Sequence, residues 1–389
     1  MTIAELIPNE QERQRLFPIA ADSLFLAHAA VTALPDCASR AMADYALACS
    51  HHHQEFGDFL TRLKDTRALA AQLIGAKPNE IALLGPTSLG LSIFAKGIDW
   101  QPGDEVLCYQ DDYPANVYPW LELQRQGVVV RFIETPEPGA ITAELVEAHL
   151  SPKTRLVALA SCHFLTGYRI DIDAIGKMLG ERGVLFSLDA IQTCGAFPTS
   201  VEHVDFMSAD AHKWLLGPMA IGIVYVKEKN FDLLRPPLLG AWNVFSPDFI
   251  AQEEIRFVPS AQRYEPGVLN AAGIMGFRAA LEMLLEIGID AVAQRLLELK
   301  HHLLSRLDAI GCEIHGPREG DAASSITTFS PPGSASALFE RLEAAGVVAS
   351  HRKDRSGAEF LRFSPHFYNT TAELDRAIEV IDDTLRSGA

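Results

Sequence analysis

Residues 187–226 read SLDAIQTCGAFPTSVEHVDFMSADAHKWLLGPMAIGIVYV, and the pattern of apolar runs in this stretch indicates an α/β fold. Three short apolar runs organise it: VLFSL ends just before Asp189, VDFMSA comes shortly before Lys213, and IGIVYV closes the unit. Short apolar runs bounded by turn residues are typical of buried strands. We therefore expect Asp189 and Lys213 at strand ends or in the loops beyond them, where open α/β sheets bind ligands.

A lysine and a carboxylate at such an edge are the two protein groups that pyridoxal phosphate (PLP) chemistry requires. The lysine forms a Schiff base with the cofactor, and the carboxylate keeps the ring nitrogen protonated so that the ring can accept electrons. The released lysine is also the natural acid and base for the proton on the substrate Cα. The stretch thus predicts Lys213 and Asp189 as catalytic residues.

The same stretch resembles the signature of the class V aminotransferases, which are fold-type I PLP enzymes. The resemblance rests on several spaced elements: Asp-Ala-x-Gln at 189–192, Val-Asp-Phe at 204–206, His212-Lys213-Trp214, Gly217-Pro218, Gly222 and Tyr225-Val226. The run HKWLLGP is most similar to the isopenicillin-N-epimerase-like branch, beside the cysteine desulfurases. The resemblance implies a fold-type I, α/β architecture with two domains. The large domain has a mostly parallel seven-stranded sheet flanked by helices, and a smaller α+β domain follows at the C-terminus.

The resemblance covers about residues 20 to 385 and implies three parts. Residues 1–20 form a segment that packs on the small domain or a partner, residues 21–270 form the large PLP-binding domain, and residues 271–389 form the small domain. It also implies a homodimer with shared active sites, in which Trp242 and Asn270 reach the neighbour's cofactor. Val268 departs from the family, which often has a phosphate-binding threonine at that place.

Composition excludes several classes of function. The chain has 389 residues, 48% of them hydrophobic, and a formal net charge of −17. The acidic balance argues against a nucleic-acid partner and against an anionic membrane surface. No secretory signal or membrane-length apolar run is visible, and six cysteines without a CxxC pair are typical of a reduced, cytoplasmic protein. We expect a small-molecule substrate, an α-amino acid.

Two other cofactor classes find no support. His51-His52-His53 does not predict a metal site, because adjacent histidines on a helix point in different directions, whereas helical metal pairs lie at i and i+4. A nicotinamide cofactor would call for Gly-x-Gly-x-x-Gly, which is not present.

The phosphate of the cofactor has a predicted site at Gly85-Pro86-Thr87-Ser88. An apolar strand, EIALL, runs into this turn and a helix begins after it, so free backbone N–H groups and hydroxyls meet at a helix N-terminus. Taken alone, the motif is better explained as an ordinary Ser/Thr helix cap. The family's phosphate turn lies at the same position, which makes Thr87 and Ser88 phosphate ligands by resemblance.

The resemblance assigns further cofactor contacts. Tyr113 lies in QDDYPANVYPW where the family stacks an aromatic ring on the pyridine. Gln192 corresponds to the residue that faces the phenolic oxygen, and His212 to a residue on the phosphate side. Asp210 departs from the desulfurases, which have serine there, and carries no phosphate role.

Substrate-binding residues follow from two further segments. LRFSPHFYNT at 361–370 matches the family's Arg-x-Ser-x-His-x-Tyr-Asn, and the planar fork of Arg362 suits a bidentate pair with an α-carboxylate. Asn116 is a weaker candidate near the substrate. His28 and His163 are polar candidates that are as readily structural.

A PLP site of this kind can support several different reactions. Reprotonation of the cofactor gives transamination, loss of a side-chain group gives a lyase, and reprotonation of Cα from the other face gives an epimerase. Desulfurases have a nucleophilic cysteine shortly before the carboxylate arginine, but VVASHRKDRSGAEFLRFS at 347–364 has none, which disfavours a persulfide mechanism. We expect a class V aminotransferase, with a lyase or epimerase lacking a catalytic cysteine, or a non-catalytic PLP-fold protein, as the alternatives.

Overall fold

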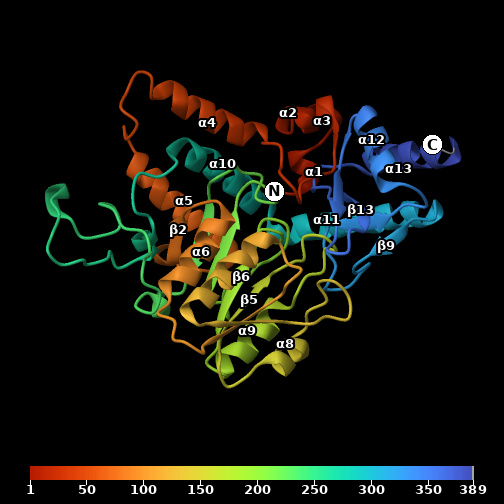
Figure 1. Cartoon of the computed structure of the whole chain (residues 1–389). Helices are drawn as coiled ribbons and strands as arrows, with labels where there is room; N and C mark the ends of the chain where they lie inside the picture. Colours follow the sequence, from red (N-terminus) through yellow and green to blue (C-terminus); the bar gives the residue numbers. More distant parts are fainter. Residues whose placement is uncertain (388–389) are drawn as a thin grey trace.

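A seven-stranded sheet organises the larger part of the computed structural model, which describes residues 1–387 (Figure 1). In spatial order its strands are β2 (Ile81–Leu83), β8 (Gly222–Val226), β7 (Phe206–Asp210), β6 (Leu185–Asp189), β5 (Thr154–Ala160), β3 (Glu105–Cys108) and β4 (Val129–Phe132). The strands β4, β3, β5, β6 and β7 run parallel, and β8 is antiparallel to both of its neighbours. The mostly parallel seven-stranded sheet predicted from the sequence is confirmed.

Alternation along each strand buries both faces of the sheet. In β7, Met207 and Ala209 belong to one hydrophobic cluster, whereas Phe206 belongs to the other. The first cluster includes residues of α5 (Phe59–Ile74), α9 (Ile172–Glu181) and α10 (Ala271–Ile287), and the second is closed by α6 (Thr87–Gly97). Since the two faces are covered, ligands have access only at the sheet's ends, and the parallel strands end together on one edge.

The C-terminal part is an antiparallel four-stranded sheet with helices. Its strand order is β12 (Ser350–Lys353), β13 (Glu359–Phe363), β10 (Thr327–Ser330) and β9 (Glu313–His315). The helices α11 (Ile289–Ala309), α12 (Ala335–Ala344) and α13 (Thr371–Ser387) share a separate core with this sheet. The hairpin of β12 and β13 matters for the site, because it directs side chains toward the larger sheet.

The N-terminal segment lies against the C-terminal part (Figure 1). It contains α1 (Ile3–Leu6), α2 (Glu10–Leu16) and α3 (Ile19–Asp22), and the short strand β1 (Leu24–Phe25) pairs in parallel with β11 (Val347–Val348). The Arg13 guanidinium lies 3.0 Å from the Glu373 carboxylate, and the ring of Phe17 stacks on Tyr368 at 4.0 Å. The start of the chain is thus held by both an ion pair and apolar burial.

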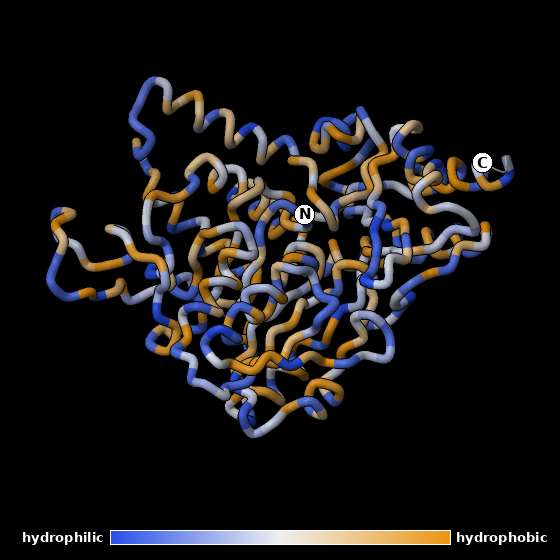
Figure 2. Tube along the Cα trace, viewed as in Figure 1, coloured by the Kyte–Doolittle hydropathy of each residue, from blue (hydrophilic) through white to orange (hydrophobic). Residues whose placement is uncertain are grey.

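An arm between β8 and α10 leaves the body of the molecule (Figure 1 and Figure 2). Large apolar side chains remain exposed along this stretch, among them Phe245, Phe249, Ile250, Ile255 and Val268. Within residues 1–387, no helix combines the length and the apolar character needed to cross a membrane.

Candidate active site

A cavity of about 300 Å³ lies at the carboxyl ends of β6 and β7. Eight of the residues singled out in the sequence line it: Thr87, Ser88, Tyr113, Asp189, Gln192, His212, Lys213 and Arg362. These residues come from five separate segments between α6 and β13, so the fold brings together residues that lie up to 275 positions apart in the sequence.

A larger hollow elsewhere does not offer comparable chemistry. It has a volume of about 580 Å³ and lies beside the start of α9, with no lysine in its lining. The guanidinium of its arginine, Arg169, already donates to the carbonyl oxygens of Ala323 and Asp321, at 2.7 and 2.6 Å. Arg169 therefore fastens the two parts of the chain together.

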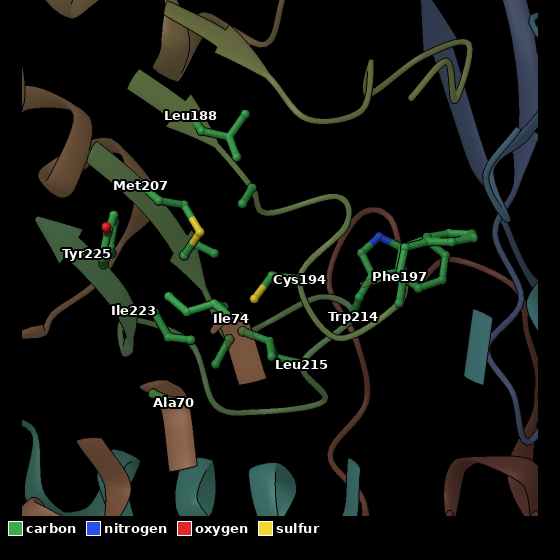
Figure 3. Packing of buried hydrophobic residues seen from close by; sticks show 14 of the residues in the cluster. Ala70, Ile74, Leu188, Cys194, Phe197, Met207, Trp214, Leu215, Ile223 and Tyr225 are labelled. Atoms are coloured by element: carbon green, nitrogen blue, oxygen red, sulfur yellow. The ribbon is translucent and has the colours of Figure 1, made fainter. Parts of the chain in front are cut away.

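Lys213 is positioned by the residues that follow it. Trp214 and Leu215 are buried in the core on one side of the sheet, near Cys194 and Phe197 (Figure 3). The indole Nε1 of Trp214 donates to Gln192 Oε1 at 2.8 Å. Because its neighbours are fixed in the core, the loop after β7 holds the Lys213 side chain in the cavity with little freedom.

Burial gives the lysine and its carboxylate unusual acidities. Burial lowers the pKa of Lys213 to about 8, although the nearby Asp189 carboxylate opposes the shift. Burial also raises the pKa of Asp189 to about 7, and the neighbouring Asp112 carboxylate adds to this. A cationic group placed against Asp189 would favour its ionised form. A cleft in which a lysine loses its proton near pH 8 rather than above pH 10 is suited to nucleophilic and proton-transfer chemistry.

Tyr113 forms one wall of the cavity. The Lys213 ammonium nitrogen lies 5.4 Å from the centre of the Tyr113 ring, which is 47% exposed. Asp112 accepts a hydrogen bond from the Tyr113 backbone N–H at 2.7 Å, and the Phe164 ring meets the Tyr113 ring edge-on at 5.6 Å. Asp112 thus fixes the Tyr113 backbone, and Phe164 braces the edge of a ring that stays half exposed, so the ring provides a stacking platform.

The opposite end of the cavity is a helix N-terminus. Helix α6 begins at Thr87 without a side-chain cap, because its N-cap residue is Pro86. The hydroxyl of Thr87 accepts a hydrogen bond from the Asp210 N–H at 2.9 Å, which leaves its proton free to donate. An uncapped start of an 11-residue helix, with two hydroxyls beside it, is a suitable place for a phosphate.

His212 and Asp210 lie beside this helix start. The His212 Nδ1 is 2.6 Å from Asp210 Oδ1, which also accepts the His212 N–H at 3.2 Å. The other oxygen, Asp210 Oδ2, is buried and has no hydrogen-bond partner among residues 1–387. Asp210 orients the imidazole of His212, so His212 presents Nε2 rather than Nδ1 to whatever occupies this end.

Arg362 is almost wholly buried at the other side of the cavity, at 1% exposure. It donates through Nη1 to the Phe164 carbonyl oxygen and through Nη2 to Ser350 Oγ at 3.4 Å, while its Nε has no partner among the described residues. Burial lowers the pKa of Arg362 to about 9, and the nearby Arg352 cation lowers it further. A buried cation with unused donors is suited to an incoming anion.

The structure places two of the predicted substrate-binding residues outside the lining of the cavity. His28 does not line the cavity, since its Nδ1 and Nε2 lie 3.0 Å from the Ser364 carbonyl oxygen and 2.9 Å from the Tyr368 hydroxyl. Asn116 is fully buried, donates to Asp112 at 2.9 Å and accepts from the indole of Trp120 at 3.2 Å. Both side chains are occupied internally and serve the scaffold.

Three other predicted residues also lie outside this cavity. Trp242 belongs to the arm, and Asn270 caps α10 by accepting the Gly273 N–H at 3.0 Å. Their expected role concerns a partner's cofactor and stays a prediction. His163 is buried, with its ring nitrogens 2.9 Å from Thr166 Oγ1 and 3.0 Å from the Asp111 carbonyl oxygen, so it braces the loop that carries Phe164.

Sequence reasoning missed two residues. Arg352 lines the cavity from β12, and Asp112 supports Tyr113 from beneath while raising the pKa of Asp189. The alternation of SHRK in a strand was the signal for Arg352, since it places Ser350 and Arg352 on one face. The acidic pair before Tyr113 was the signal for Asp112.

Comparisons with known proteins agree with this arrangement. The family model described as Aminotransferase class-V matches residues 24–377. A probable cysteine desulfurase of Pyrococcus abyssi is 26% identical over 346 residues, which are 84% of each chain. Among solved structures, an apo cysteine desulfurase from Thermococcus onnurineus has a TM-score of 0.89 at 22% identity, over 97% of this chain and 98% of that one. A C-DES mutant with glycine covalently linked to its PLP cofactor has a TM-score of 0.85 at 19% identity, over 95% and 99%.

The two solved structures support the fold, and the family model supports more, because it spans most of the chain and includes every residue that lines the cavity. The fold and the cavity residues Lys213, Asp189 and Arg362 are therefore all consistent with the family that the model identifies. This chain belongs to the class V aminotransferase family.

Proposed function

We propose that this protein is a PLP-dependent enzyme that acts on the Cα bonds of an α-amino acid, with the cofactor attached to Lys213. One observation carries the proposal. Lys213, Asp189, Tyr113 and Arg362, four residues with complementary tasks, converge on one cavity of about 300 Å³. A non-catalytic protein of this fold would have no reason to keep all four in that geometry.

The residues fit the cofactor at each of its ends. The uncapped start of α6 with Thr87 and Ser88 would hold the phosphate, together with His212. Tyr113 would lie over the ring, and Asp189 would hold the ring nitrogen. Gln192 donates one amide proton to the Ala29 carbonyl oxygen at 3.1 Å, which leaves a second for the ring oxygen. When bound, PLP withdraws electrons from a breaking bond at the substrate Cα.

The protein's own groups then do three things. Arg362 would bind the α-carboxylate and so orient the bonds at the substrate Cα. Lys213, whose pKa burial lowers to about 8, would take the Cα proton and return it. The Asp189 carboxylate would stabilise a positive charge on the ring nitrogen.

Transamination is the leading reaction, and β-elimination at sulfur is the second candidate. The name of the Pyrococcus relative favours chemistry on cysteine. No cysteine lines the described cavity, however, and burial raises the pKa of Cys162 to about 11 and that of Cys194 to about 12. A persulfide on this chain therefore lacks a suitable thiolate. Any lyase activity would release its leaving group without a protein nucleophile.

A single-turnover reaction separates the two candidates. The holoenzyme is mixed with a panel of amino acids without a keto-acid acceptor, and the released cofactor is identified by chromatography. Conversion to pyridoxamine phosphate is the result expected for a transaminase. Unchanged PLP with loss of an amino acid identifies a lyase, and unchanged PLP with an inverted amino acid identifies an epimerase. An intact cofactor with no amino acid consumed would contradict catalysis altogether.

The rate at which apoprotein captures PLP should depend on pH. Lys213 must be neutral to attach, and burial lowers its pKa to about 8 from an ordinary 10.5. The rate should therefore rise about tenfold per pH unit below 8 and level off above it. Stopped-flow absorbance measures this rate.

Asp189→Asn is the informative variant for this profile. Asp189 holds the pKa of Lys213 up, so its neutralisation should move the break to lower pH. A rate that climbs steadily to pH 10, as for an exposed lysine, would contradict the assignment.

We further propose a cytoplasmic homodimer. The six cysteines are all free thiols, as in a reducing compartment. The arm between β8 and α10 exposes Phe249 and Val268 at 77% and 71%, more than a monomer tolerates without reason. A second copy packed on this arm would bring Trp242 and Asn270 toward the partner's cavity. Light scattering of the holoenzyme measures the association.

A further inference from the structure

We propose that Arg352 binds a second anionic group of the substrate, which makes the substrate an α-amino acid with an acidic side chain. The side-chain group would be a carboxylate, a sulfinate or another small oxyanion. The inference rests on the proposed function of the cavity and specifies it further: Arg362 takes the α-carboxylate and Arg352 the distal acid.

The hairpin register places the two arginines on one face. In the antiparallel pair of β12 and β13, Ser350 lies opposite Arg362 and Arg352 opposite Phe360. Side chains two positions apart on a strand share a face, so Arg352 is the diagonal neighbour of Arg362. Such neighbours are about 7 Å apart at their Cβ atoms. Two long side chains with that spacing can hold the two ends of one short dianionic molecule.

The Arg352 guanidinium has no partner in the protein. Among residues 1–387 it makes no hydrogen bond or ion pair, and its Nε is buried and unsatisfied. The residues on either side of Arg352 in β12, by contrast, have an acidic partner on the other face of the strand. Lys353 lies 2.6 Å from the Glu359 carboxylate, and His351 lies 3.3 Å from the same carboxylate. Arg355 pairs with Asp111. Among the residues that the structure describes, the two cations of this hairpin without a counter-ion, Arg352 and Arg362, are the two that line the cavity.

The cavity lining has more basic than acidic side chains. Its lining contains Lys213, Arg352 and Arg362 but a single carboxylate, Asp189. At the other end, α6 and His212 would hold the cofactor phosphate, and Asp189 would compensate the positive charge of the ring nitrogen. A substrate α-carboxylate accounts for Arg362. Arg352 then remains uncompensated, and a partly buried cation without a counter-ion is costly unless a ligand supplies one.

Binding of unreactive acids tests this directly. The affinity of the holoenzyme for succinate and glutarate is measured by calorimetry and compared with that for butyrate and valerate, which lack only the second carboxylate. The wild type should bind each diacid roughly tenfold or more tightly than its monoacid. Arg352→Gln should bring the ratio close to one by weakening the diacids alone. Lys353→Gln, which removes the same charge from the opposite face of the strand, should leave the ratio unchanged.

Two outcomes would overturn the proposal. A wild-type ratio near one would mean that no second anion site exists. An equal loss of diacid and monoacid binding in Arg352→Gln would mean that both arginines hold the same carboxylate. The wild-type ratio is informative even if the variant fails to fold, and glutamate compared with glutamine repeats the test with amino acids. The bound-cofactor spectrum is recorded alongside: its loss from the wild type would contradict the proposed function, whereas a retained spectrum with a ratio near one would contradict Arg352 alone.

Discussion

Lys213→Ala is expected to abolish turnover, with a loss of at least about 10³-fold in kcat, together with the absorbance of lysine-linked PLP. The reason lies in the double task of this residue. Its amine is the group to which the cofactor attaches, and it is the one basic amine among the residues that line the cavity. Neither task can pass to a neighbour, since Arg352 and Arg362 remain protonated at the pH of catalysis.

Lys300 provides the matched control for this prediction. It is also buried, and burial lowers its pKa to about 8, but it donates to the Ile326 carbonyl oxygen at 2.8 Å in the C-terminal part. Lys300→Met should keep the chromophore and turnover of the folded enzyme. If Lys213→Ala remains active with an unchanged spectrum, or if Lys300→Met is the variant that loses the spectrum, the assignment of the cofactor lysine is wrong.

Arg362→Ala should raise the KM of an α-amino acid roughly 100-fold or more, because a buried bidentate partner of the carboxylate is lost. Arg362→Lys keeps the charge without the planar fork and should restore only part of the affinity. Steady-state kinetics measure both variants. The loss should fall mainly on KM, since the carboxylate is bound in both the ground state and the transition state.

The side chain of Arg341, exposed on α12, offers a control for the loss of positive charge from the same domain. Arg341→Ala should leave KM unchanged. An Arg362→Ala enzyme that folds, binds PLP and keeps its KM would place the α-carboxylate elsewhere in the cavity. A primary amine without a carboxylate should react equally with Arg362→Ala and the wild type.

The apolar runs and the turn residues that bound them predicted the strands of the large sheet well. The strands β6 and β7 begin and end within two residues of the apolar runs VLFSL and VDFMSA that predicted them. Such runs are informative because buried parallel strands are nearly continuous apolar stretches. Asp189 is the last residue of β6 as expected from such a run. In the C-terminal sheet, β10 begins at Thr327, directly after Ser324 and Ser325, whose hydroxyls donate to the carbonyl oxygens of Gly167 and Pro365.

The site could be predicted only where a motif fixes both residue and direction. His28 and Asn116 are polar and close to the motifs, yet their partners come from distant segments, which no local pattern reveals. Arg352 was missed for the converse reason: its direction depends on the register of the β12–β13 hairpin, and a shift of one residue would turn it to solvent. Both the hydrogen-bond partners of a buried polar side chain and the register of a strand pair depend on tertiary structure.

The most direct test of the account is to identify the residue that carries the cofactor. The PLP-loaded protein is reduced with sodium borohydride, which makes a lysine-linked pyridoxyl group permanent, and its peptides are sequenced by mass spectrometry. We expect one pyridoxyl group per chain, on Lys213. A pyridoxyl group on Lys300 or another lysine, or none after demonstrated loading, would contradict it.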